Sequence, residues 1–265
     1  MSKKFMSVSV AFLLILLSSI TTFAHNGWIE SNNPMVETSQ NAYVSLYLGN
    51  HSDQHTSYRI DRNWGIQDSK IVVKTPSNEE VNVTDEFYYM GEVSEVDDDR
   101  AGLNNFYNGS FTVEEEGLYT VIAKGDFKYG EQEKATVRTA KSFIGAKENP
   151  TLSEMNQLTG FDEPQVSNRG EIVPLFNPLT VQSGDYVTAQ LMFDGEPVED
   201  EEVAVIQRST SKDLQLVTDL NGKIAWETAD ADYYLIRAEF EQDGIEYEAT
   251  MTFVVNEEYN DEESE

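Results

Sequence analysis

Three histidines near the start of the chain could together bind a transition metal. They are His25, His51 and His55, and the sequence holds no others. His51 and His55 lie four residues apart with Asp53 between them. On a helix the two histidines share a face, on a strand Asp53 lies on the same face, and a loop after Gly49-Asn50 is the third alternative. Imidazole suits zinc, copper, nickel and iron, so the three histidines form a chemically reasonable ligand set.

His25 matters most because the sequence predicts that it becomes the first residue of the mature protein. Lys3 and Lys4 precede the mostly apolar segment 8–20, and the small residues Thr22 and Ala24 follow it. This is the layout of a secretory signal peptide over residues 1–24. Its apolar part is shorter than the roughly 20 residues that a membrane span needs. Cleavage after Ala24 would give His25 a free α-amine beside its imidazole, which together make a bidentate nitrogen chelate. The expected location is the periplasm.

Composition narrows the classes of function. Residues 1–24 contain two lysines and no acid, so their removal changes the net charge from −30 to −32. Such a surface repels nucleic acid, which binds clustered Lys and Arg, and no stable membrane insertion is expected after cleavage. The sequence has no cysteine, which excludes disulfides, thiolate metal sites and cysteine nucleophiles. No serine lies in a Gly-x-Ser-x-Gly elbow, and the tryptophans are interpreted as core anchors, so an enzyme is not expected.

The elements that must position the histidines read almost entirely as β-strands. Alternation or β-branched runs predict strands over 42–48, 70–74, 119–123 and 186–193. Asp194-Gly195, Asn221-Gly222 and Asp243-Gly244 are typical hairpin turns between such runs. No mature segment carries a long apolar period of 3.6 residues. The prediction is an all-β protein of immunoglobulin-like or transthyretin-like sandwiches.

A weak internal repeat predicts two such domains. Residues 117–122 (GLYTVI) resemble residues 231–236 (ADYYLI), and each copy precedes a glycine turn and a final strand. The predicted organisation is an N-terminal sandwich over 25–145, a linker over 146–170 and a C-terminal sandwich over 171–256. One helical turn is expected in the linker near Leu152–Leu158. Residues 257–265 are strongly acidic and are expected to be a disordered tail.

Several segments resemble an exported bacterial family associated with cobalt or nickel uptake systems. The likeness is carried by Ala24-His25 with Trp28 and Glu30, and by the segments 171–178 (EIVPLFNP), 193–198 (FDGEPV), 218–223 (TDLNGK) and 247–253 (YEATMTF). The resemblance implies a periplasmic nickel- or cobalt-associated binding protein with His25 as a ligand. Members often place a Gly-His pair after the first strand, whereas Asn50 separates Gly49 from His51 here.

The leading hypothesis is therefore a periplasmic protein that binds nickel or cobalt through His25, His51 and His55 for delivery to a membrane metal transporter. Copper and zinc are alternative metals. A second hypothesis is a copper oxidase that uses a terminal-histidine brace. A third is an immunoglobulin-like structural or adhesion module with no ligand, in which His51 and His55 are surface residues of a polar loop.

Overall fold

The computed structural model describes residues 26–49, 69–90, 106–128, 135–210 and 212–257. Nearly every element in these ranges is a β-strand, which confirms the all-β class. Their helical structure is limited to the 3-10 turn η2 (Thr84–Glu86) and the short helix α3 (Leu152–Met155). The helix lies where the sequence predicted one turn, and the Thr151 hydroxyl caps it by accepting the Glu154 N–H at 3.2 Å. Within the described ranges, no helix has the length and apolarity to cross a bilayer.

The strands fall into an N-terminal and a C-terminal set. The N-terminal set is β1 (Asn26–Ser31), β2 (Met35–Glu37), β3 (Asn41–Gly49), β4 (Ser69–Lys74), β5 (Glu80–Asn82), β6 (Tyr88–Tyr89), β7 (Tyr107–Thr112), β8 (Gly117–Lys128) and β9 (Ala135–Lys147). The C-terminal set is β10 (Gly170–Pro174), β11 (Tyr186–Phe193), β12 (Glu196–Pro197), β13 (Glu202–Gln207), β14 (Asp213–Val217), β15 (Lys223–Glu227), β16 (Asp232–Gln242) and β17 (Ile245–Val255).

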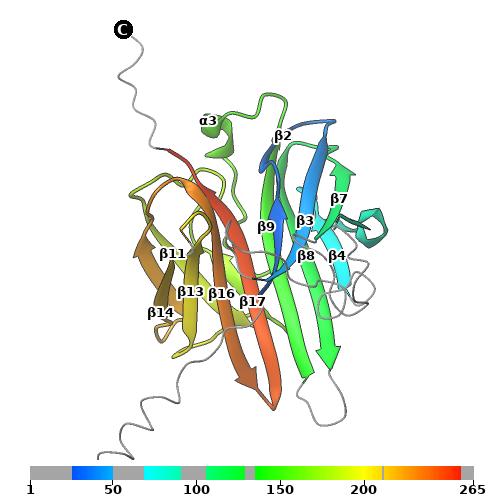
Figure 1. Cartoon of the computed structure of the whole chain (residues 1–265). Coiled ribbons are helices and arrows are strands. Elements are labelled where there is room, and N and C mark those ends of the chain that lie inside the picture. The colour runs from blue at the N-terminus through cyan, green and yellow to red at the C-terminus, as the bar shows by residue number, and fades with distance from the viewer. Residues whose placement is uncertain (1–25, 50–68, 91–105, 129–134, 211, 258–265) are drawn as a thin grey trace, which may run out of the picture.

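The described strands form three sheets, and the largest runs through both halves of the chain. Its order is β14-β13-β16-β17-β9-β8-β4-β5, with β2 beside the end of β9. The second sheet has the order β1-β3-β7-β6, and the third contains β10, β11, β12 and β15. The halves meet where β17 pairs with β9 in parallel, from Glu246 opposite Thr136 to Met251 opposite Lys141. Figure 1 shows these two strands side by side at the centre of the molecule.

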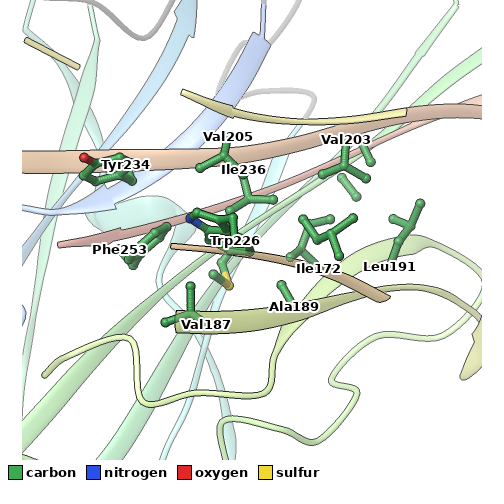
Figure 2. Packing of buried hydrophobic residues seen from close by; sticks show 14 of the residues in the cluster. Ile172, Val187, Ala189, Leu191, Val203, Val205, Trp226, Tyr234, Ile236 and Phe253 are labelled. Atoms are coloured by element: carbon green, nitrogen blue, oxygen red, sulfur yellow. The ribbon is translucent and has the colours of Figure 1, made fainter. Parts of the chain in front are cut away.

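Each half has its own apolar core. The C-terminal core lies between the third sheet and strands β13, β16 and β17, with Trp226 packed among Ile172, Ala189 and Phe253 (Figure 2). The N-terminal core lies between the second sheet and strands β4, β8 and β9, and its members include Ile29 and Leu46, both 0 % exposed. Two sandwiches are therefore joined through one continuous sheet.

The segment expected to be a linker contributes to the C-terminal core. Met155 is 0 % exposed and Phe161 is 5 % exposed, and both pack in the cluster that contains Phe143 of β9. The rings of Phe143 and Phe161 meet edge to face, with centroids 5.6 Å apart. The proposed boundaries at 145/146 and 170/171 stay predictions, but Met155, Leu158 and Phe161 between them are packed against the core.

A tyrosine with the same local hydrogen bond opens one long strand in each half. The Tyr119 hydroxyl donates to the Glu115 carbonyl at 3.0 Å, and the Tyr234 hydroxyl donates to the Asp230 carbonyl at 2.9 Å. A tyrosine bonded to the backbone a few residues upstream is a hallmark of immunoglobulin-like sandwiches. By this hydrogen bond Tyr119 corresponds to Tyr234, one residue away from the Tyr233 with which the sequence comparison had aligned it.

Two of the three expected hairpin turns are present. Asp194-Gly195 and Asp243-Gly244 have positive φ at both residues and connect paired strands. The expectation is wrong for Asn221-Gly222, because β15 pairs with β11 and β14 pairs with β13. This turn instead passes the chain from one sheet to another, with Gly222 at φ 69°.

Candidate functional site

The predicted metal ligands His25, His51 and His55 all lie outside the described residues. What the structure does describe is the strands next to His25 and His51 in the chain. Among the described residues, no group of three or more histidine, aspartate and glutamate side chains is arranged to hold a metal ion.

Strands β1 and β3 lead to two of the histidines at the same end of one sheet. The strands are antiparallel, with Asn26 opposite Gly49 and Trp28 opposite Tyr47. His25 is bonded to Asn26, and His51 follows Gly49 by two residues. The described ends that precede and follow these histidines in the chain, Gly49 and Asn26, therefore lie side by side.

Strand β1 is held in place by side chains of the last strand. The Glu248 carboxylate accepts the Gly27 N–H at 2.6 Å, and the Thr250 hydroxyl donates to the Gly27 carbonyl at 2.7 Å. The Thr252 hydroxyl donates to the Ile29 carbonyl at 2.8 Å. An edge strand presents a row of unpaired backbone groups, and these contacts satisfy three such groups of β1 on the side away from β3. The second half of the chain thus holds β1 from the side opposite β3.

Glu248, which accepts the Gly27 N–H at the start of β1, belongs to a largely buried cluster of charged side chains. Glu248 is 3 % exposed at its side chain and accepts a hydrogen bond from Arg138 Nε at 2.6 Å. Glu239 lies directly opposite Glu248 on β16 and pairs with Arg237 at 3.1 Å. Burial raises the pKa of Glu239, the Arg237 charge lowers it, and the Glu248 charge raises it further. The carboxylate that holds Gly27 thus lies in a cluster of two glutamates, each paired with an arginine.

One buried polar atom at the first residue of β1 has no hydrogen bond within the described structure. Asn26 is 4 % exposed, and its Oδ1 has no hydrogen-bond partner among those residues. Buried polar atoms of this kind are rare and call for an explanation. Asn26 directly follows His25 in the sequence, so this acceptor lies one residue from the predicted chelate.

An aromatic stack runs from β1 over β3 to Phe106, which directly precedes β7. Trp28 stacks on Tyr47 with ring centroids 5.1 Å apart, and Tyr47 stacks on Phe106 at 5.2 Å. Burial raises the pKa of the Tyr47 phenol. Trp28 and Trp226 are 6 % and 5 % exposed, which confirms their interpretation as buried anchors, while Trp64 lies outside the described residues. The Trp28–Tyr47 stack adds a side-chain contact to the backbone pairing of β1 with β3.

A buried ion pair that the sequence did not indicate ties β9 to β10. Lys141 Nζ donates to Glu171 Oε2 at 2.8 Å, and the two side chains are 0 % and 1 % exposed. Glu171 also accepts the backbone N–H groups of Gln165 at 3.0 Å and Val166 at 3.2 Å. Burial lowers the pKa of Lys141, and the Glu171 charge opposes that effect. The pair is enclosed and has a structural role.

Sequence reasoning missed Glu248, Thr250 and Thr252 because they alternate with apolar residues of β17. Glu248, Thr250 and Thr252 have the period of a solvated strand face, yet all three are buried. The signal that could have found them is the run of polar residues at every second position of a long strand near the end of the chain. That pattern alone does not say what covers the face.

The comparisons with known proteins assign a family. The family model described as "Domain of unknown function (DUF4198)" matches residues 22–242, so the chain belongs to this family. No curated protein matches the chain in sequence.

Similar solved structures are distant. They include a structure of a 1.5-MDa bacterial ice-binding adhesin, with 9 % identity, TM-score 0.28, and coverage of 89 % of this chain and 65 % of that one. A DUF4785 family protein from Legionella pneumophila has 9 % identity, TM-score 0.27, and coverage of 79 % and 51 %. Fibronectin(III)-like modules of Clostridium thermocellum CbhA have 10 % identity, TM-score 0.25, and coverage of 88 % and 97 %. The chain thus spans less than two thirds of the adhesin and about half of the Legionella protein. At these TM-scores the likenesses carry no argument about function.

Proposed function

We propose that the chain is an exported periplasmic protein that binds nickel or cobalt and passes it to a membrane metal transporter. The proposed ligands are the α-amine and imidazole of His25 with the imidazoles of His51 and His55. It is a binding protein and not an enzyme. The cargo is a divalent ion that accepts nitrogen donors, which the cysteine-free sequence supplies through histidine and the terminus.

The observation that carries the proposal is the pairing of Asn26 with Gly49. It supports a shared site because the segments that lead to His25 and His51 leave one ladder at the same end. The anchoring of Gly27 by Glu248 at 2.6 Å supports it further, since a chelating terminus needs a fixed entry. The buried Asn26 Oδ1 offers an acceptor to an N–H group of the histidine before it.

Isothermal titration calorimetry with NiCl2 and CoCl2 on the mature chain beginning at His25 tests the proposal. We expect micromolar or tighter binding that weakens on acidification, because protons compete for amine and imidazole ligands. A Gly-Ser extension before His25 keeps every side chain but moves the α-amine away. We expect this extension and His25→Ala each to weaken binding about tenfold or more, and the same extension after Glu265 to have no effect.

The outcomes separate the three hypotheses. Binding that survives both N-terminal changes removes His25 from the site. The proposal is refuted if the protein binds neither nickel nor cobalt. A melting temperature that does not change on addition of nickel, cobalt, copper or zinc favours a structural module. A copper(II) resonance spectrum with nitrogen hyperfine coupling, together with peroxide-dependent oxidation of a polysaccharide, would identify the protein as a histidine-brace oxidase.

A further inference from the structure

A groove opens at the side of the N-terminal sandwich, away from the start of β1. Its volume is about 850 Å³, within the range of ligand sites. Its walls come from the β4–β5 hairpin on one sheet and from β7 with the following turn on the other. The floor is formed by the side chains of Val73, Val83, Phe111 and Tyr119.

The groove exposes a side chain that belongs to the inner face of the sandwich. Val81 lies opposite Val73 in the β4–β5 pairing and therefore points to the same side of the sheet. Val73 is 1 % exposed and Val83 is 4 % exposed, whereas Val81 is 45 % exposed. The inner face is thus left partly uncovered at β5, and an apolar contact point is available to a ligand.

Two strand edges border the groove without a described partner. In the described residues β5 pairs with β4 alone. Strand β6 pairs with β7 only at Tyr107 and Asn108, so β7 has no described strand partner on that side from Gly109 to Thr112. Unpaired edges of this kind accept an extended segment by main-chain hydrogen bonds.

The charge of the groove selects the kind of segment. Glu79, Glu86 and Glu114 are exposed on its rim, and no lysine, arginine or histidine is among the described residues that line it. Glu115 accepts hydrogen bonds from the Ser77 N–H at 3.2 Å and the Ser77 hydroxyl at 2.7 Å. The hydroxyl bond lowers the pKa of Glu115, so its carboxylate is ionised at neutral pH.

We propose that this groove binds an extended basic peptide segment of a partner protein, in which lysine or arginine alternates with apolar residues. The apolar side chains contact Val81 and Phe111, the cations meet the carboxylates of the rim, and the backbone pairs with the unpaired strand edges. This site is separate from the proposed metal terminus and does not depend on it.

Fluorescence anisotropy on the full mature chain tests the proposal with a labelled Lys-Val-Lys-Val-Lys-Val peptide. Glu79→Gln/Glu114→Gln removes two rim charges, and Glu196→Gln/Glu227→Gln is the control, since these exposed residues of the other half give the same change in net charge. We expect the groove variant to weaken binding about fivefold, as for two surface ion pairs, and the control less than about twofold. Val81→Ser should weaken binding of this peptide but not of a Lys-Ser repeat.

Four results overturn the proposal. One is equal weakening in the groove and control variants, which assigns the binding to bulk charge. Another is an absence of binding at low ionic strength, or amide shift changes in NMR spectra that lie outside residues 79–83 and 109–115. The last is a dimer in sedimentation that Glu79→Gln/Glu114→Gln dissociates, which would assign the groove to a second copy of the chain.

Discussion

The buried pair of Lys141 and Glu171 gives the sharpest test of how the fold is held together. Lys141→Met removes the ammonium group but keeps most of the side-chain volume. It leaves the Glu171 carboxylate, which is 1 % exposed, without its cation. Breaking a buried ion pair on one side costs about 3–5 kcal/mol of unfolding free energy. Domains have about 5–15 kcal/mol in total, so the loss is large.

A double variant separates the charge from the hydrogen bonds. Glu171 accepts two backbone N–H groups, from Gln165 and Val166, besides the Lys141 ammonium. Lys141→Met/Glu171→Gln removes both charges but keeps an amide oxygen for those N–H groups. We expect it to lie within about 1 kcal/mol of the unsubstituted protein. Lys141→Met/Glu171→Leu leaves both N–H groups buried without an acceptor, which costs about 1–3 kcal/mol for each group.

Urea unfolding followed by tryptophan fluorescence measures these differences, with the slope of the transition as the check that each variant unfolds over the same surface. We expect the Gln double variant to be the most stable of the three, and the Leu double variant and Lys141→Met both to be clearly less stable. The reasoning is refuted if Lys141→Met costs less than about 1 kcal/mol, or if the Gln double variant is as unstable as the single one.

Three further predictions concern single groups. Tyr119→Phe should lower the unfolding free energy more than Tyr234→Phe, because the Tyr119 hydroxyl makes two hydrogen bonds to the backbone and the Tyr234 hydroxyl makes one. Each lost hydrogen bond contributes about 0.5–1.5 kcal/mol. The midpoints of urea unfolding compare the two variants. Burial raises the pKa of Glu239, so the folded state binds its proton more tightly and loses stability as pH rises through that pKa. Glu239→Gln should therefore be more stable than the parent at neutral pH, and thermal melts should show the gap closing towards pH 4. Gly222→Ala should destabilise by more than about 1 kcal/mol, because Gly222 has φ 69° and a Cβ there meets the Leu191 carbonyl oxygen at 2.5 Å; an unchanged melting temperature would contradict this.

Much of the fold followed from local pattern. The alternation of 186–193 predicted β11 with its bounds, and Asp243-Gly244 predicted the β16–β17 hairpin, because both signals depend on residues adjacent in the chain. The parallel pairing of β17 with β9 was not predicted, since the residues that meet there are about 110 apart in sequence. Asn221-Gly222 misled for the same reason, because its local turn chemistry does not say which sheet the next strand joins.

The candidate site was less accessible to sequence reasoning. The histidines could be chosen by chemistry, and the structure leaves them outside its described residues. The groups that fix the entry of β1 were hidden in an ordinary strand pattern. Glu248 is buried because β1 lies over it, and no property of residues 245–255 alone reveals that cover.

The attachment of the first strand to the last has a consequence for biogenesis. A chain is synthesised from its N-terminus, so Gly27 and Ile29 leave the ribosome long before Glu248, Thr250 and Thr252. Those partners follow by 221 to 223 residues. Until they are made, β1 lacks these three contacts to β17. The final seating of β1 must therefore follow the synthesis of β17.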